Sequence, residues 1–407
     1  MRNKKKYFLI IALIISLCSM GMNKKEDTQD GKIFKNIYIE NINIEHLTIE
    51  EAKKNIIKNY PLQTIHIKNN EKKWSITPEE IDLDYNINKA IKRAYEYTRE
   101  EDDIKNIKKM FNLYFKGPYI INLHASYNEV KLSGILSDIC KEINAGAVQA
   151  TINIKDSSQV ITTDSKEGIE VDSIKLKETI YDMIDKKNIE EVELPINVIY
   201  PRVKTEDVKS VDSILGQYST SFYNHSARGS NVHLAGKSTS DILIMPGEIF
   251  SYNEATGART WSNGYKSAKV IVGGKYVNGE GGGVCQVSTT IYNAALLAGM
   301  EIKEVHNHTF TSHYALRGKD AAVSYGYTDF KFRNPYSHPI YIKNILSNGS
   351  ITSKIYGCSQ DRERIYIRTE EKYNKDKIDV KTYRIYLNKA NKKIREELIA
   401  QSRYKIK

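Results

Sequence analysis

A cysteine stands between a glycine run and a helical pattern in this chain, an arrangement typical of a reactive thiol. Three glycines ending at Gly283 lead directly into Val284 and Cys285. Apolar residues then recur with helical spacing as far as Gly299, a residue type that commonly ends helices. We therefore expect Cys285 at a helix N-terminus, where free N–H groups and the helix dipole favour the thiolate and lower its pKa. The alternative is a free cysteine that only packs at a helix start.

The residues near Cys285 suit acyl transfer. Gly283 has no side chain and lets a substrate backbone approach closely. The backbone N–H of Gln286 is a candidate, with that of Cys285, for receiving an oxyanion. Arginines bind carboxylates through two nitrogens, so they are candidate anchors for a substrate carboxylate, with surface ion pairs as the alternative. The candidates are Arg228, Arg259 and Arg317.

A thiol nucleophile needs a base and a group that orients the base. His306 and His308 both follow the predicted helix, and on an extended segment they share one face, so periodicity does not separate them. We take His308 first because it adjoins a strand predicted over 309–316. Asp320 begins the next predicted strand and is the preferred orienting acid, with Asp329 as the alternative. Either acid is also compatible with a simple turn role.

Metal binding is a further alternative for the histidines. His306, His308 and His313 lie close in sequence, but carboxylate partners at a recognisable spacing are missing. We therefore predict no metal and no cofactor.

The first residues of the chain predict export. Arg2 and a run of lysines precede an apolar stretch at 7–17, which is followed by a polar stretch at 23–30. The apolar stretch is shorter than the roughly 20 residues that span a bilayer, and Leu17 and Cys18 nearly match a lipoprotein processing site. We expect a signal or membrane anchor at 1–22, and an extracytoplasmic protein associated with the membrane or the cell wall.

The cysteine count and the net charge indicate which kinds of partner the protein has. The chain has 4 cysteines, and an odd number remains beyond the leader, so no disulfide framework is indicated. Unpaired cysteines in an exported protein are most simply explained if one of them is reactive. The formal net charge of +11 favours anionic wall polymers or lipid headgroups. A nucleic-acid partner is not predicted, because no recognition motif is present.

The pattern along the chain predicts an α+β protein with two main regions. Linkers at 23–33 and 205–213 separate the leader, a wall-binding region at 34–204 and a catalytic domain at 214–358, with a basic extension at 359–407. The first region repeats a loose order of helices and strands, which leaves open an internal repeat or two lobes of one unit. The second is predicted as a thiol-enzyme-like domain, with one nucleophile helix packed on antiparallel strands at 309–316, 321–325, 329–332 and 340–345.

The second region, from about residue 219 to 357, resembles the VanW domain. The region before it resembles the peptidoglycan-binding module that often precedes VanW and L,D-transpeptidase domains, through the segments 47–52, 74–81 and 193–195. The VanW resemblance rests on Pro246 to Asn253, Gly257 to Thr260, the glycine and cysteine segment through Ala295, His306 to His308, Gly318 to Ala321, and Pro339 to Ile342.

The resemblance implies a role in the cell wall, since some VanW members act as L,D-transpeptidases. It carries the nucleophile onto Cys285, whereas His308 and Asp320 as its partners follow from the order of residues here. The Ser-His-Gly-Cys stretch of the usual L,D-transpeptidases is absent. We predict 3-3 cross-linking of peptidoglycan stem peptides through a thioester. The alternatives are a thiol carboxypeptidase or endopeptidase on the same stems, and a non-catalytic wall-binding protein linked to glycopeptide resistance.

Overall fold

The computed structural model describes residues 31–70, 72–155, 159–272 and 275–406. They form two compact units, one of residues 31–146 and 168–199 and the other of 147–167 and 200–406. The predicted leader and its possible lipoprotein site lie outside the described residues. Within those residues, no helix is long and apolar enough to cross a membrane.

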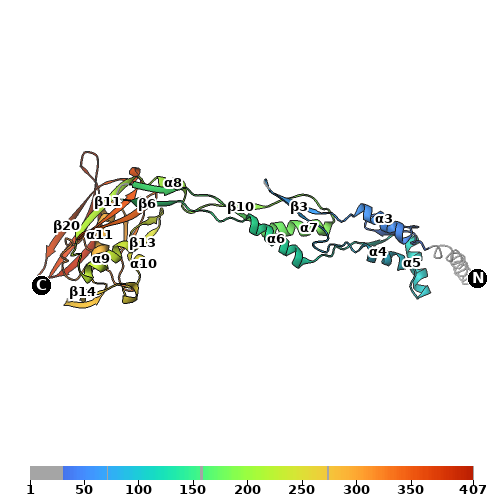
Figure 1. Ribbon diagram of the computed structural model, residues 1–407, viewed down its shortest axis with the longest axis horizontal. Coiled ribbons are helices and arrows are strands. Elements are labelled where there is room, and N and C mark those ends of the chain that lie inside the picture. Colours follow the sequence, from blue (N-terminus) through green and yellow to red (C-terminus); the bar gives the residue numbers. More distant parts are fainter. Residues whose placement is uncertain (1–30, 71, 156–158, 273–274, 407) are drawn as a thin grey trace, which may run out of the picture. The chain divides into compact units, whose positions relative to one another are not determined.

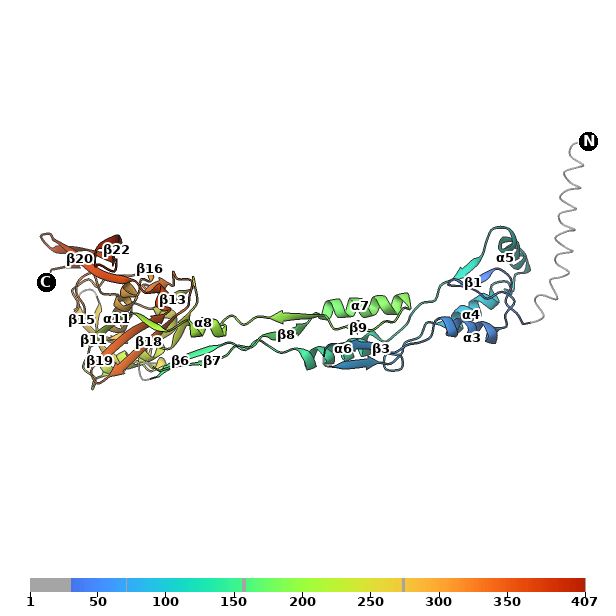
Figure 2. The ribbon, with the colours of Figure 1, turned by 90° about the horizontal axis from the view of Figure 1, so that it is seen from above.

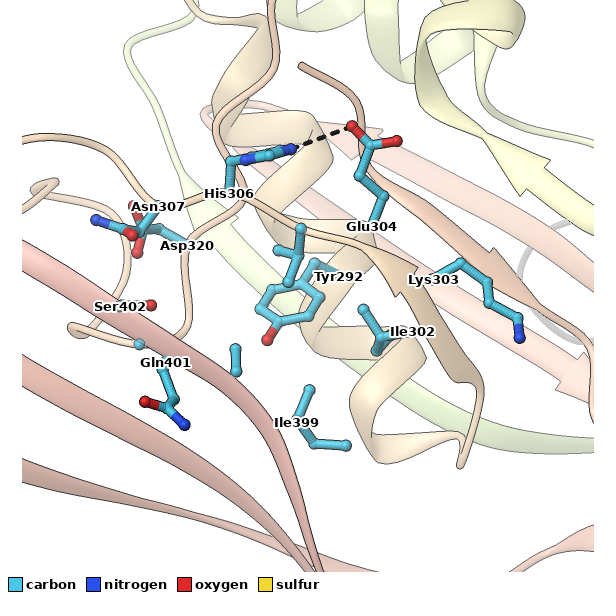
Figure 3. A pocket seen from close by; sticks show the side chains of 13 residues that line it. Tyr292, Ile302, Lys303, Glu304, His306, Asn307, Asp320, Ile399, Gln401 and Ser402 are labelled. Atoms are coloured by element: carbon cyan, nitrogen blue, oxygen red, sulfur yellow. Dashed lines mark hydrogen bonds and ion pairs between the residues drawn. The ribbon is translucent and has the colours of Figure 1, made fainter.

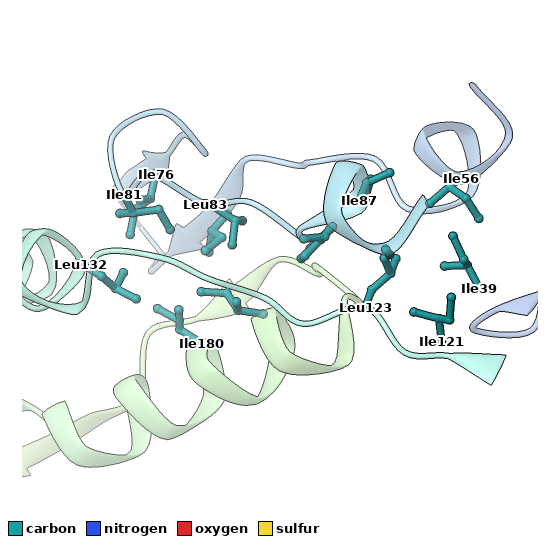
Figure 4. Close-up of a cluster of buried hydrophobic side chains, with 14 of the residues drawn as sticks. Ile39, Ile56, Ile76, Ile81, Leu83, Ile87, Ile121, Leu123, Leu132 and Ile180 are labelled. Atoms are coloured by element: carbon teal, nitrogen blue, oxygen red, sulfur yellow. The ribbon is translucent and has the colours of Figure 1, made fainter. Parts of the chain in front are cut away.

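The first unit combines five helices with three small sheets around one apolar core. Its sheets have the orders β2-β1-β5, β4-β3-β9 and β10-β8. Figure 4 shows isoleucine and leucine side chains from several of these elements turned toward each other in that core. The elements are β1 (Ile37–Ile39), β2 (Ile42–Asn43), α3 (Ile49–Asn59), β3 (Ile65–Lys68), β4 (Lys73–Ile76), α4 (Ile87–Glu96), α5 (Asp103–Phe115), β5 (Tyr119–Ile121), α6 (Glu129–Ile143), β8 (Gly168–Val171), α7 (Ser173–Lys186), β9 (Val192–Glu193) and β10 (Ile196–Ile199).

Local sequence signals explain the helices of this unit. Thr48 and Glu51 form the expected capping box at the start of α3, each side chain bonding the other's backbone N–H. The helices predicted near residues 48–58, 86–97, 129–144 and 172–185 are confirmed as α3, α4, α6 and α7. Their amphipathic pattern needs no distant information, which is why the sequence predicts them well.

The second unit is built around helix α11 (Val284–Leu297). It packs on β11 (Ser213–Ser221), β19 (Ser350–Gly357), β20 (Arg364–Tyr373) and α9 (Ala227–Ser238), and every residue from Gln286 to Leu296 is buried. Figure 1 and Figure 2 both show α11 enclosed by strands of this unit. A helix buried on all sides must satisfy its polar side chains internally.

The second unit contains several small antiparallel sheets, in the orders β11-β19-β18-β12, β13-β17-β16, β14-β15, β6-β7 and β20-β21-β22. The mixed α+β class is therefore confirmed. The remaining elements are β6 (Thr151–Lys155), β7 (Gln159–Thr163), α8 (Thr205–Lys209), β12 (Ile242–Ile244), β13 (Ile249–Ser251), α10 (Tyr252–Thr256), β14 (Ser267–Val272), β15 (Lys275–Glu280), β16 (Glu301–Glu304), β17 (Lys331–Arg333), β18 (Ile340–Ser347), β21 (Lys377–Leu387) and β22 (Lys393–Lys405), with short 3-10 turns at Trp261–Asn263 and Ser359–Asp361.

Two strand predictions in this unit are wrong. Residues 309–316 and 321–323 form irregular loop, and Ser324 makes only an isolated bridge to Thr328. For the segment that begins at Ala321, the reason is that polar side chains of α11 take the backbone groups that a neighbouring strand would have paired. Ser288 donates to Ala321 O at 2.6 Å, and the Ala321 N–H donates to Thr289 at 3.0 Å.

Strand β11 packs directly on the backbone of α11 because Gly216 has no side chain. A Cβ at this position would lie 2.5 Å from Ala294 O and from Ala298 N. Gly216→Ala should therefore lower the free energy of unfolding by about 1–3 kcal/mol, as overpacking does. Calorimetry measures this change.

The matched control is Gly134→Ala in α6, where an added Cβ meets nothing within 4 Å. That change should stabilise the protein by about 0.5–1 kcal/mol, because alanine favours the helix. Equal stability of the Gly216→Ala protein and the unmodified protein would contradict the close packing of β11 on α11.

Candidate functional site

Cys285 lies in the first turn of α11, directly after a backbone that only glycine tolerates. Gly283 is the N-cap residue with a φ of 113°, and a Cβ there would lie 2.9 Å from Cγ of Arg228. The thiol is partly buried, and its Sγ lies 3.5 Å from Val323 O. The helix N-terminus predicted for Cys285 is thus present.

The imidazole of His308 is the main polar partner of this thiol. Burial alone would raise the pKa of Cys285, but the hydrogen bond and charge of His308, the Val323 contact and the charge of Arg259 together outweigh burial. The pKa of Cys285 therefore lies below that of an ordinary thiol. A thiolate beside an imidazolium is the reactive form of a cysteine nucleophile.

Asp320 holds His308 from the other side. Its Oδ2 lies 2.6 Å from His308 Nδ1 and accepts the backbone N–H of the same histidine at 2.8 Å. Burial by itself would lower the pKa of His308, but the hydrogen bonds and charges of Asp320 and Cys285 raise it to about 10. With Nδ1 facing Asp320, Nε2 is left for Tyr314, whose hydroxyl lies 3.3 Å away, and for the thiol.

The loop that carries Asp320 is fixed by α11 itself. Asn293 donates to Lys319 O at 2.7 Å, on the residue just before Asp320. Ser288 and Thr289 bond the backbone of Ala321, just after it. The helix that presents Cys285 therefore also sets the position of the acid that orients His308.

The alternative base and acid make other contacts. His306 is about half exposed, and its Nε2 lies 3.1 Å from Glu304 Oε1. Asp329 accepts from Ser251 Oγ at 2.6 Å and from Asn253 N at 2.9 Å, which fixes the start of α10. The structure thus brings His308 and Asp320 to Cys285, whereas these two alternatives bond elsewhere.

Gln286 and Arg228 form a second layer beside the thiol. The Gln286 side chain donates to Thr220 Oγ1 at 2.9 Å and to Ser221 O at 2.8 Å, and its Oε1 accepts from Arg228 at 2.7 Å. Its backbone N–H donates to Gly283 O at 3.0 Å, so this N–H is already engaged. The backbone N–H of Cys285 is therefore the better placed oxyanion donor of the two.

Arg259 contributes positive charge near Cys285. Its Nη2 donates to Asn253 at 2.7 Å, and its guanidinium lies 5.5 Å from the ring centre of Tyr252 and 5.7 Å from that of Tyr325. Its Nε and Nη1 are buried with no hydrogen-bond partner among the described residues. Arg317, the other candidate anchor, instead pairs with Glu371 at 2.9 Å.

Two tyrosines complete the site without any local sequence signal. Tyr404 donates a short hydrogen bond to Asp320 Oδ1 although it lies 84 residues further along the chain. Tyr252 donates to Val284 O at 2.8 Å, next to the thiol. Tyrosines are common in this chain, so only the folded structure singles these two out.

A pocket of about 350 Å³ opens beside Asp320, between α11 and β22. Figure 3 shows Tyr292, Asp320, Gln401 and Ser402 around it, with His306 turned to Glu304 at its edge. Among the described residues, no group of three or more histidine, cysteine or carboxylate side chains is arranged to hold a metal ion.

Fold and site together define an α+β protein in which a cysteine at the start of a buried helix lies beside a histidine that is hydrogen-bonded to an aspartate. Comparison with known proteins finds a family match in each of two regions of the chain. Residues 227–356 match the family described as VanW like protein, and residues 74–193 match the Putative peptidoglycan binding domain. The chain therefore contains a VanW-family domain preceded by a domain of that peptidoglycan-binding family.

Two curated proteins illustrate the similarity. The uncharacterized protein YoaR of Bacillus subtilis is 39% identical over 176 residues, which are 43% of this chain and 58% of YoaR. The vancomycin B-type resistance protein VanW of Enterococcus faecalis is 25% identical over 166 residues, which are 37% of this chain and 60% of that protein. This chain thus spans less than two thirds of either relative. No solved structure matches it significantly.

The geometry predicts an unusually reactive thiol. Iodoacetamide should alkylate Cys285 with a pH midpoint below the value of about 8.5 that is typical of a free cysteine, because His308 and Arg259 favour the thiolate. His308→Gln removes the imidazolium and should raise the midpoint. Mass spectrometry of the Cys285 peptide across pH measures the rate.

Cys140 is the internal control, since burial raises the pKa of its thiol. A Cys285 midpoint equal to or above that of Cys140 would contradict the electrostatics described above.

Proposed function

We propose that this protein is an exported peptidoglycan L,D-transpeptidase that forms 3-3 cross-links between stem peptides through a thioester on Cys285. The observation that carries the proposal is the His308–Asp320 hydrogen bond beside Cys285 at the start of α11, where His308 lowers the pKa of the thiol. A thiol nucleophile is activated by a base that a third group orients, and these residues can supply the three roles. The VanW-family domain and the preceding domain support the cell wall as the substrate.

The first half-reaction is acylation of the enzyme. The Cys285 thiolate attacks the amide carbonyl at the third residue of a donor stem, and the carbonyl oxygen becomes an oxyanion beside the backbone N–H of Cys285. The intermediate collapses, the C–N bond breaks, and the terminal D-amino acid leaves as an amine. The His308 imidazolium gives that amine its proton.

The second half-reaction forms the cross-link. An acceptor amine from a neighbouring stem loses its proton to His308 and attacks the thioester carbonyl. The C–S bond breaks, and the Cys285 thiolate is restored beside the imidazolium. Asp320 keeps Nδ1 of His308 oriented in both halves, so Nε2 faces the reacting atoms.

Other parts of the chain have supporting roles in this proposal. Arg259 anchors a substrate carboxylate, because two of its nitrogens still lack an acceptor. The first unit holds the enzyme on peptidoglycan, and the excess positive charge favours anionic wall polymers. Residues 1–22 attach the protein to the membrane or direct its export.

Cys285→Ala should abolish cross-linking of purified stem peptides. The matched control is Cys358→Ala, which removes a free, buried cysteine that has no part in the site described above. Chromatography with mass spectrometry separates the dimer from a hydrolysed tripeptide. Undiminished dimer with Cys285→Ala would leave a non-catalytic wall-binding protein as the function, and tripeptide without dimer would identify a thiol carboxypeptidase.

Arg259→Gln should raise the KM for the donor stem at least tenfold, since a hydrogen bond to a charged group contributes about 1.5–3 kcal/mol. Arg317→Gln is the control, because its guanidinium is already paired with Glu371. Steady-state kinetics with varied donor distinguishes the two. Equal KM values in both variants would exclude Arg259 as the anchor.

A further inference from the structure

The residues after the VanW-family match form a sheet that holds the loop of His308 and Asp320. This sheet consists of β20, β21 and β22 and follows residue 356, where the match ends. Asn307, next to His308, donates to Arg403 O at 2.9 Å. The N–H of Lys405 donates to Thr309 O at 2.9 Å, on the other side of the histidine. Strand β22 therefore bonds the residue before His308 and the residue after it.

The same sheet holds the segment that leads into Asp320. Thr382 on β21 donates to Gly318 O at 2.8 Å. The Gly318 N–H in turn donates to the hydroxyl oxygen of Tyr404 at 2.7 Å. Gly318 has a φ of 79°, and a Cβ there would lie 2.5 Å from Oγ1 of Thr382, so the loop and the sheet fit closely.

Tyr404 links this sheet to the acid itself. Its side chain is completely buried, and its hydroxyl donates to Oδ1 of Asp320 while accepting from Gly318. The other oxygen of Asp320, Oδ2, faces His308. Both carboxylate oxygens thus have donors, although the residue is only 3% exposed.

A buried carboxylate that loses a donor becomes harder to ionise. Without the Tyr404 hydroxyl, Oδ1 of Asp320 would lose its side-chain donor inside the protein, so Asp320 would orient His308 less firmly. A His308 imidazolium that is held less firmly would stabilise the Cys285 thiolate less, so a smaller fraction of the thiol would be ionised at a given pH.

We propose that Tyr404 is a positioning residue for the proposed transpeptidase, acting through Asp320 and His308, and that the C-terminal sheet is part of the active site. This inference rests on the proposed function. Residues 359–407, which the sequence predicts only as a basic extension, thus supply Tyr404. Tyr404 acts on Asp320, Asp320 on His308, and His308 on Cys285.

Tyr404→Phe keeps the ring and removes only the hydroxyl, so it tests the hydrogen bond. The pH midpoint for iodoacetamide alkylation of Cys285 should rise by on the order of one unit. The other groups that act on this thiol, Arg259, Tyr252 and Tyr314, are unchanged in the variant. Cross-linking kcat should fall with little change in the donor KM.

Thr382→Val is the matched control, because it removes a bond from the same sheet to the same loop without touching Asp320. A merely structural role would lower the melting temperature of both variants and move the alkylation midpoint of neither. An unshifted midpoint with Tyr404→Phe, or an equal shift with Thr382→Val, would overturn the inference.

The readout also separates this inference from the proposed function. Alkylation needs no stem peptide, so Tyr404 can shift the midpoint even if cross-linking is absent. Conversely, cross-linking could require Cys285 and still show the same pH profile in the Tyr404→Phe protein. That result would support the proposed function and exclude the role of Tyr404.

Discussion

The hydrogen bond between Asp320 and His308 is the interaction on which the rest of the site depends. It fixes which imidazole nitrogen faces the thiol, and its charge helps to raise the pKa of His308 while that of Cys285 falls. Neither residue lies in a regular helix or strand. An irregular loop can hold a catalytic geometry only if rigid elements fix its backbone from outside.

Two elements provide that support, and they approach the loop from different sides. Helix α11 bonds the backbone of Lys319 and Ala321 through Asn293, Ser288 and Thr289. The C-terminal sheet bonds Gly318 and the residues next to His308. The polar residues inside a completely buried helix therefore have two effects at once, since they satisfy the interior and position the reacting groups.

Much of the first unit and the start of α11 could be predicted from the sequence, because both rest on local patterns. Thr48 with Glu51 predicts a helix start, and glycines before Cys285 predict another. The loop at 309–325 could not be predicted, since apolar and aromatic residues there suggest strands, whereas distant side chains of α11 bond the backbone of Ala321. The pairing of Asp320 with Tyr404 is also beyond sequence reasoning, because only the fold brings those two segments together.

The most direct measurement of the central claim is the intact mass of the full-length protein, quenched in acid soon after mixing with a tetrapeptide stem and no acceptor. The account predicts a mass increase equal to the stem without its terminal amino acid, located on Cys285 and lost in Cys285→Ala. Unmodified protein together with intact stem, or an adduct on a different residue, would contradict a Cys285 thioester.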